Sequence, residues 1–319
     1  MRDDIAALPP RLLGELEKVI VGQTDTLTML LSTVLSGGHV LLEDRPGVGK
    51  TVLAKALGTV LGVDMGRVQG TPDLLPTDIS GVHVFQPHTA EWDFRAGPVF
   101  TQLLLVDELN RATPKAQSAL LEAMAEKQVT VDGHTFAVPD PFIVIATQNP
   151  LGEAGTYPLA NAQIDRFAAM LHLGLPGTAA ERAVLLGHAG KDNLSAIGPV
   201  ITSDFVTALV GFVRRTDAAE AIVDYTIALV NQIRAVDPSI WLSVRVSEML
   251  LNVARGHAFM NQRDYVAPED VQRAAPAVLA HRLPGSVDLA AIEQIIRTVP
   301  VPVNSLSASP ANAAPLDAP

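Results

Sequence analysis

One short run of residues has the types and spacing that bind phosphate. The run consists of Gly47, Val48, Gly49, Lys50, Thr51 and Val52. Glycines at two of these positions let the backbone turn so that consecutive N–H groups point at one anion. A helix beginning near Lys50 would add its positive dipole end, and the Lys50 ammonium would reach the outer phosphates. Because the Thr51 hydroxyl can bind Mg²⁺, the run predicts a loop for a nucleoside triphosphate with Mg²⁺.

The loop departs from the usual pattern at one position. The full pattern has a glycine at position 44, where this sequence has Asp44. That position mainly shapes the turn, so we expect the loop to tolerate the change. An ordinary glycine turn before a helix is the alternative. The apolar strand expected at 39–42 and the Lys50–Thr51 pair favour the phosphate loop.

Acidic residues follow a second apolar strand, at 103–106. Asp107 and Glu108 would then lie at the carboxyl edge of a parallel sheet, where ligands bind in open α/β folds. Asp107 could hold Mg²⁺, directly or through water, and Glu108 could act as general base on the attacking water. Acids that merely end a strand in solvent are the alternative, and the phosphate loop upstream argues against it.

A third apolar strand ends at Asn149. Its side chain could hydrogen-bond the attacking water or the γ-phosphate. A turn-forming asparagine before Pro150 explains the residue equally well. The spacing by itself leaves both interpretations open.

The elements that must position these residues alternate between apolar strands and helices. Strands at 39–42, 103–106, 142–145 and 170–173 with helices between them predict an α/β fold, a parallel sheet buried on both faces. Alternating segments at 82–95 and 129–138 predict two inserted hairpins. Helices alone are expected from 176 onward.

The resulting domain organisation has four parts. We expect a flexible leader at 1–10, an α/β core at 11–175, an all-helical domain at 176–302 and a disordered Ala/Pro/Ser tail at 303–319.

Composition excludes several classes of protein. The 319 residues include no cysteine, so disulfides, zinc–thiolate sites and cysteine nucleophiles are absent. The formal charge of −11 argues against a chain built mainly to coat nucleic acid or anionic lipid. No apolar run is long enough to span a membrane and no secretory signal is evident, so a soluble cytoplasmic protein is expected.

Longer blocks resemble the MoxR family of AAA+ ATPases. They lie at residues 71–78, 100–124, 146–150, 155–158 and 162–167. The resemblance runs from about residue 20 to residue 302, nearly the whole chain, and these blocks are more specific than the phosphate loop. It implies a three-layer AAA+ core with a parallel sheet and inserted hairpins, followed by an all-α lid, and ATP with Mg²⁺ as nucleotide and metal.

The resemblance also assigns residues. Asn149 would be the sensor-1 residue, and Arg166 would be an arginine finger that reaches the γ-phosphate of a neighbouring subunit. Arg245 would be the sensor-2 arginine, contacting the nucleotide of its own subunit. Val21 and Gly22 would lie near the adenine.

The function implied is an ATP-driven machine. Members of this family form rings, expected to be hexameric, and remodel or mature partner proteins, often with a partner that carries a von Willebrand factor A domain. The inserted hairpins would face the client. Three alternatives stay open: a nucleotide-gated scaffold with little turnover, a subunit resembling the magnesium chelatase ATPase, and a DNA-dependent machine. The last is disfavoured by the acidic charge.

Overall fold

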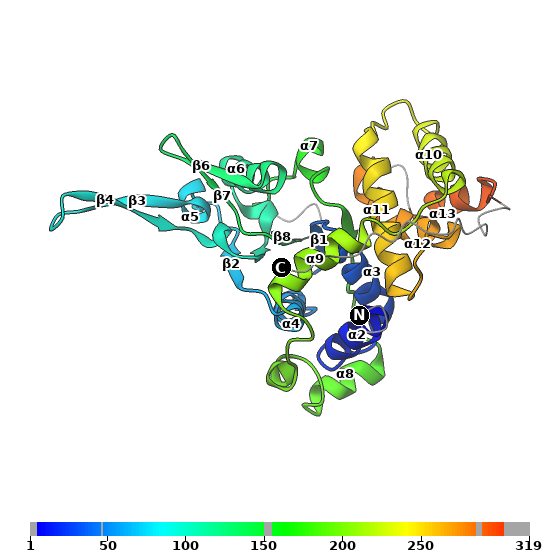
Figure 1. Ribbon diagram of the computed structural model, residues 1–319, viewed down its shortest axis with the longest axis horizontal. Helices are drawn as coiled ribbons and strands as arrows, with labels where there is room; N and C mark the ends of the chain where they lie inside the picture. The colour runs from blue at the N-terminus through cyan, green and yellow to red at the C-terminus, as the bar shows by residue number, and fades with distance from the viewer. Residues whose placement is uncertain (1–4, 46, 150–154, 285–288, 303–319) are drawn as a thin grey trace.

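The computed structural model describes residues 5–45, 47–149, 155–284 and 289–302 (Figure 1). The predicted tail and the first four residues of the predicted leader lie outside these ranges. The central sheet has five parallel strands in the order β2-β5-β8-β1-β9. Their bounds are β1 Val40–Glu43, β2 Met65–Gln69, β5 Leu103–Asp107, β8 Ile143–Gln148 and β9 Ala169–Leu171.

Helices cover both faces of this sheet. The elements of the first half are α2 Leu8–Glu17, α3 Thr24–Leu35, α4 Lys50–Leu61, α5 Pro76–Ser80, η1 Pro98–Phe100, η2 Leu109–Arg111, α6 Pro114–Glu126 and α7 Asn161–Ile164. Alternate strand residues enter two separate apolar cores, so that Leu103 and Leu105 pack with α4 while Leu104 and Val106 pack with α6. This alternation confirms the predicted three-layer arrangement with a sheet buried on both faces.

Two antiparallel hairpins interrupt the sheet, as predicted. They are β3 Gly81–Gln86 with β4 Glu91–Ala96, and β6 Gln128–Val131 with β7 His134–Ala137. Phe94 of the first hairpin stacks on Phe136 of the second, with ring centroids 4.3 Å apart. The hairpins therefore support each other near the core, and the β3–β4 hairpin projects far beyond it (Figure 1).

Only helices follow the sheet within the described residues, as expected. They are α8 Thr178–Leu185, η3 Lys191–Ala196, α9 Ser203–Val213, α10 Glu220–Arg234, α11 Val244–Met260, α12 Pro268–Leu279, η4 Ala280–Arg282 and α13 Leu289–Thr298. The division at residue 175 remains a prediction, because one continuous apolar core contains side chains of α3 and α4 as well as of α10, α11 and α12.

The leader is shorter than the sequence suggested. Helix α2 begins at Leu8, and Leu8 and Pro9 are buried, so the prediction of a flexible segment through residue 10 is wrong for these positions. The two prolines at 9 and 10 favour this start because the first turn of a helix needs no backbone N–H donors from them.

Helices α3 and α11 approach closely enough to require glycine. A Cβ atom on Gly256 would lie 2.0 Å from the carbonyl oxygen of Ser32. We expect Gly256→Ala to lower the free energy of unfolding by about 3 kcal/mol, because the two helices must separate. Chemical denaturation measures this change.

Gly14 is the matched control, since it also lies inside a helix but a Cβ there would meet nothing within 4 Å. Gly14→Ala should be neutral or stabilise by up to about 1 kcal/mol. Equal stability of the Gly256→Ala variant and the wild type would contradict the close helix contact.

Candidate active site

The phosphate loop has the backbone that its glycines were expected to allow. Gly47 has φ +92° and Gly49 has φ +97°, and Gly49 is the N-cap residue that directly precedes helix α4. A Cβ at either position would meet no atom within 4 Å, so glycine is required here by conformation and not by space. The loop leads directly into the N-terminus of a twelve-residue helix, an arrangement suited to an anion.

Lys50 is buried and directed along the loop. Its Nζ donates to the carbonyl oxygen of Asp44, and lies 3.5 Å from the carbonyl oxygen of Gln148. These carbonyl oxygens hold the ammonium between β1 and β8, at the carboxyl ends of both strands.

The side chain of Asp44 has a structural role that the glycine usual at this position of the loop could not fill. Its carboxylate accepts hydrogen bonds from the backbone N–H groups of Leu173, at 2.6 Å, and Gly174, at 3.2 Å. The side chain thus ties the phosphate loop to the segment that leaves β9. A glycine at this position would lack this connection.

Thr51 and Asp107 lie together, as predicted for a magnesium site. The Thr51 hydroxyl is 3.4 Å from both carboxylate oxygens of Asp107. Asp107 is buried and also accepts a hydrogen bond of 2.8 Å from Nε of Arg67 on β2. Arg67 was not predicted to lie here, because nothing in the local sequence pattern indicates that β2 pairs with β5.

Glu108 is held in an uncommon backbone conformation at the end of β5. It has φ +54° and ψ +48°, a left-handed conformation that a non-glycine residue adopts at an energetic cost. Its backbone N–H donates to the Thr147 hydroxyl at 2.8 Å. A Cβ on Gly70 would lie 2.2 Å from the carbonyl oxygen of Glu108, so only glycine fits beside this turn.

Two side chains orient the Glu108 carboxylate. Its Oε2 accepts hydrogen bonds from Nε2 of Gln69, at 3.1 Å, and from Nη1 of Arg111, at 3.0 Å. Neither partner was predicted, since Gln69 comes from another strand and Arg111 from the turn after β5. The carboxylate is partly exposed, so a water molecule can reach it.

Asn149 is buried directly after β8, and the side chain of Asn110 hydrogen-bonds its backbone. The Asn110 amide donates to the Asn149 carbonyl oxygen at 3.1 Å and accepts from the Asn149 N–H at 3.4 Å. The structure therefore places Lys50, Thr51, Asp107, Glu108 and Asn149 along one edge of the sheet.

Arg166 and Arg245 lie at the opposite edge. Both line a cavity of about 450 Å³ together with His39 and Phe142, which precede strands β1 and β8. Four residues of β1 separate this edge from the phosphate loop, about 13 Å at the usual rise of a strand. For Arg166 this agrees with a role on a neighbouring subunit.

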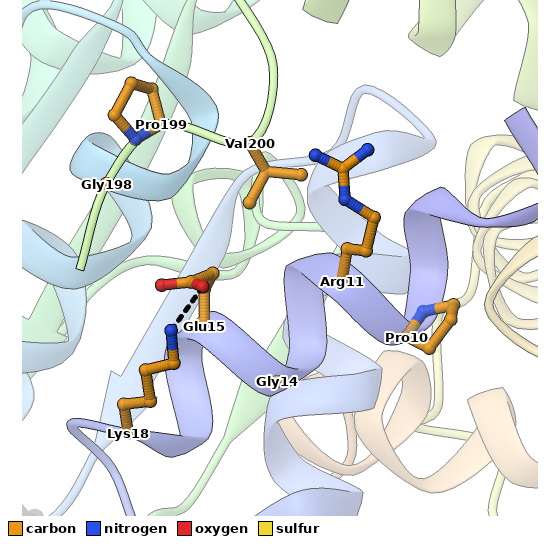
Figure 2. Close-up of a pocket in the computed structure, with 8 residues that line it drawn as sticks. All are labelled: Pro10, Arg11, Gly14, Glu15, Lys18, Gly198, Pro199 and Val200. Carbon is orange, nitrogen blue, oxygen red and sulfur yellow. Dashed lines mark hydrogen bonds and ion pairs between the residues drawn. The ribbon is translucent and has the colours of Figure 1, made fainter. Parts of the chain in front are cut away.

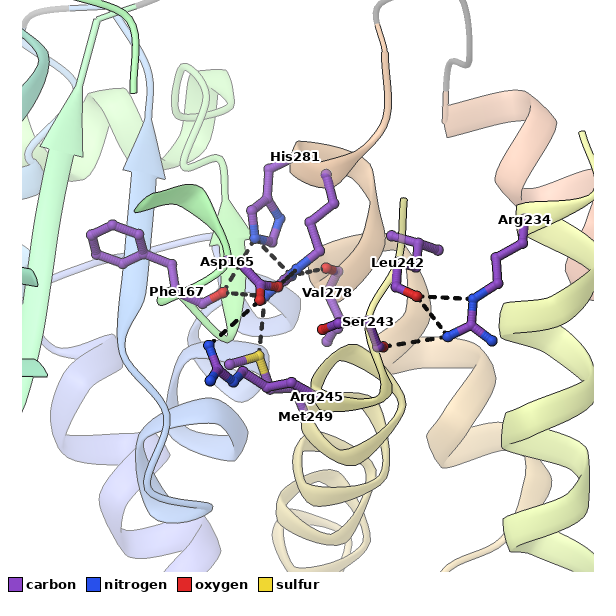
Figure 3. Close-up of polar contacts among 10 residues, drawn as sticks. Asp165, Phe167, Arg234, Leu242, Ser243, Arg245, Met249, Val278 and His281 are labelled. Atoms are coloured by element: carbon purple, nitrogen blue, oxygen red, sulfur yellow. Dashed lines mark hydrogen bonds and ion pairs between the residues drawn. The ribbon is translucent and has the colours of Figure 1, made fainter. Parts of the chain in front are cut away.

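The expectation that Arg245 contacts the nucleotide of its own subunit is not supported by this placement. Arg245 Nη1 lies 3.7 Å from a carboxylate oxygen of Asp165 (Figure 3). Asp165 directly precedes Arg166 in the sequence. The reason is tertiary: Met249 and Asn252 of helix α11 line the same cavity as the amino end of β1, which brings the start of α11 to this edge.

Val21 and Gly22 lie between α2 and α3, next to α8. Gly22 has φ +76°, and a Cβ there would be 3.3 Å from the Ala180 Cβ of α8. This turn brings α8 close to the start of α3. The adenine contact assigned to these two residues remains a prediction.

A second cavity, of about 360 Å³, lies between α2 and residues 198–200 (Figure 2). Lys18 and Glu15 form an ion pair at its wall. None of the residues expected at the nucleotide site lines this cavity, so we assign it no part in nucleotide binding.

His39 in the larger cavity gives the fold a pH dependence. Its Nδ1 accepts the Val144 N–H at 3.1 Å, and removal of the ring from water lowers its pKa from 6.5 to about 4. The stability that neutral His39 supplies is present above pH 6.5 and is lost as the pH falls towards 4, because the unfolded chain then binds the proton. Between pH 7 and pH 5 we expect this to cost roughly 1–2 kcal/mol of unfolding free energy.

Denaturation curves of His39→Gln at the two pH values test this. The variant should lose less stability on acidification than the wild type, whereas a variant of exposed His188 should behave as the wild type does. An unchanged pH dependence in His39→Gln would contradict the assignment.

Comparisons with known proteins agree with this architecture. Residues 39–169 match the family described as "ATPase family associated with various cellular activities (AAA)", and residues 242–299 match an AAA lid domain. No helix in the described ranges has the length and apolar character needed to cross a membrane.

Relatives extend the match to almost the full chain. "Uncharacterized protein YeaC" of Bacillus subtilis is 41% identical, over 95% of this chain and 97% of that protein. "Chaperone MoxR1" of Mycobacterium tuberculosis is 38% identical, over 92% and 82% respectively. A crystal structure of a candidate ATPase from Cytophaga hutchinsonii superposes with a TM-score of 0.81 at 34% identity, covering 94% of this chain and 96% of that one. The phosphate loop, the acidic strand end, the sheet order and these relatives together show that the chain belongs to the MoxR family of AAA ATPases.

Proposed function

We propose that this ATPase hydrolyses ATP with Mg²⁺ in a ring, expected to be hexameric, and uses the energy to remodel a client protein. The observation that carries the proposal is the separation of the two halves of the site. Lys50 and Glu108 lie at one edge of the sheet, and Arg166 lies at the other. A second copy of the chain is needed to bring Arg166 to the γ-phosphate, where its charge would offset the charge that develops there.

The residues of one subunit divide the chemistry among them. The loop N–H groups and Lys50 bind the phosphates, while Gln69 and Arg111 orient the Glu108 carboxylate towards a water. Glu108 then takes a proton as general base, and Asn149, clamped by Asn110, positions the reacting groups. Arg166 and, by its position, Arg245 would act on the nucleotide of the next subunit.

Thr51 and Asp107 are the residues that would hold Mg²⁺. Their hydroxyl and carboxylate oxygens are 3.4 Å apart and suit a hard cation that keeps most of its waters and phosphate ligands. Within the described ranges, no three His, Asp or Glu side chains gather into a metal site made by protein alone. When bound, Mg²⁺ supplies charge neutralisation of the phosphates.

Replacing Thr51 with alanine tests this assignment. We expect the Mg²⁺ concentration for half-maximal ATPase activity to rise by at least about tenfold, because even indirect metal contacts are worth that much. Titration of activity with Mg²⁺ measures the shift. Thr59→Ala, an exposed threonine of the same helix, is the control; a Thr51→Ala variant with the wild-type Mg²⁺ requirement would refute the site.

The β3–β4 hairpin is the part that we propose contacts the client. Phe85 and Trp92 pair across it with ring centroids 5.4 Å apart, and they are 45% and 69% exposed. Apolar rings this exposed on a projecting hairpin suit contact with another protein. The chaperone name of the mycobacterial relative supports such a role, and a partner with a von Willebrand factor A domain is part of the proposal.

Size measurement with and without ATP tests the ring, and affinity capture tests the client. In ATP, a Glu108→Gln variant should form the ring and retain client protein. The double variant Glu108→Gln, Trp92→Ser should still form the ring but should no longer retain the client. If the protein stays monomeric in ATP and Mg²⁺, the shared site is refuted.

A further inference from the structure

The residue before Arg166 is held by an arginine of the lid. One carboxylate oxygen of Asp165 accepts a hydrogen bond of 3.1 Å from Nε of Arg282, which ends η4. The other oxygen faces Arg245 of α11 at 3.7 Å (Figure 3). Asp165 is thus shared between two arginines that come from two different lid elements.

Arg282 also holds the residue after Arg166. Its Nη2 donates to the Phe167 carbonyl oxygen at 2.6 Å and lies 3.1 Å from Sδ of Met249. Its Nη1 donates to the carbonyl oxygen of Val278 in helix α12, which directly precedes η4. One planar guanidinium therefore fixes the chain on both sides of Arg166 and anchors it to helices α11 and α12.

Burying the guanidinium of Arg282 costs free energy unless each of its N–H donors has a hydrogen-bond acceptor. Its side chain is only 4% exposed, and burial lowers the pKa of the guanidinium while Asp165 opposes that shift. The adjacent His281 has a pKa well below its usual value because of burial and the Arg282 charge. His281 is therefore neutral and adds no second cation, and the buried arginine persists because its rigid fork is satisfied.

Arg166 itself is left available. Among the described residues, none forms a hydrogen bond or ion pair with its guanidinium, which lines the cavity at the amino edge of the sheet. The neighbouring backbone is fixed by the lid, whereas the side chain can extend towards another molecule.

We propose that Arg282 is a positioning residue for Arg166, so that the lid of each subunit holds the arginine that completes the site of the next. The inference rests on the proposed shared site and deepens it. It means that the lid and the arginine move as one body. A change in the lid of one subunit is then felt at the nucleotide of its neighbour.

Arg282→Ala should lower kcat by about 100-fold, because a displacement of about 1 Å at a reacting group has that effect. ATP affinity should stay within about twofold of the wild type, since the phosphate loop is untouched. Arg282→Lys should not restore activity, because a single ammonium cannot reach both the Asp165 carboxylate and the Phe167 carbonyl. If Arg282→Ala does not fold, Asp165→Asn removes the same ion pair with little change in volume.

Arg263→Ala controls for general loss of lid stability. Arg263 donates two hydrogen bonds, of 2.6 and 2.7 Å, to buried Asp270 and stays within the lid. This variant should unfold at a lower temperature yet keep kcat near the wild-type value. An equal loss of kcat in Arg263→Ala and Arg282→Ala would show that the effect is one of lid stability, and would overturn the proposal.

Mixed rings give the decisive readout. Arg282→Ala subunits retain Glu108, and Glu108→Gln subunits retain an Arg166 that is held in position. When the two variants are mixed at random in equal amounts, about a quarter of the interfaces should combine an intact Glu108 with a positioned Arg166. Activity should recover to about that fraction. If Arg166→Ala recovers activity with Glu108→Gln but Arg282→Ala does not, Arg282 acts within its own subunit and the proposal is wrong. If neither pair recovers, the shared site itself fails, and the proposal with it.

Discussion

Glu108→Gln will lower kcat for ATP hydrolysis by at least about 100-fold, because a positioned general base contributes 10²–10⁴ to the rate. The amide keeps the shape of the carboxylate and an oxygen that can accept from Gln69 and Arg111, so the local structure should survive. ATP should therefore still bind. Phosphate release and binding of a fluorescent nucleotide measure the two effects separately.

The control for this variant is Glu122→Gln, which changes an exposed glutamate on helix α6 in the same way. It should hydrolyse ATP at the wild-type rate. If the wild type and Glu108→Gln both bind ATP and show the same near-zero rate, the chain is a nucleotide-gated scaffold rather than a motor. That result would leave the fold and the nucleotide site standing.

Arg166→Ala should have an effect of similar or greater size. Removing an arginine that acts on the transferred phosphoryl group from another subunit costs about 10³–10⁵ in kcat. The variant keeps every residue at the carboxyl edge of the sheet, so its own nucleotide site is intact. Its ATP affinity should stay close to that of the wild type, and steady-state kinetics separate the two parameters.

Mixing distinguishes this mechanism from a local structural defect. Arg166→Ala and Glu108→Gln subunits, each inactive by itself, should together recover about a quarter of the wild-type activity. Arg297→Ala, which removes an exposed arginine of α13, should be active without mixing. Full hydrolysis by Arg166→Ala rings would refute the shared site, even though the family assignment would be unaffected.

Local sequence predicted the parts of the site that depend on a few consecutive residues. The phosphate loop needs only Gly47, Gly49, Lys50 and Thr51 in a short strand–turn–helix segment. Its positive φ angles are those that glycine makes accessible. Asp107 and Glu108 follow from an apolar run that ends in acidic residues, at the edge where the strand ends of a parallel sheet meet. For Asn149 the spacing left two interpretations open, and only the family resemblance assigned it to the site.

The surroundings of these residues could not be predicted in this way. Gln69 and Thr147 reach Glu108 because β2 and β8 lie on either side of β5, an order that no local pattern specifies. Asp44 departs from the loop pattern in the sequence. Its carboxylate can accept the backbone N–H of Leu173 only because β9 lies beside β1 in the sheet.

The sequence by itself therefore determined the family of the chain and the order of strands and helices along it, and it predicted the chemistry of the nucleotide edge. Tertiary structure alone decided that Arg245 lies with Arg166 at the far edge, and that Arg282, more than 100 residues from Asp165, is its buried partner. The physical reason is that turns and strand ends obey local backbone preferences. Contacts between distant segments depend instead on how the lid helices pack on α3, through side chains spread over the whole chain.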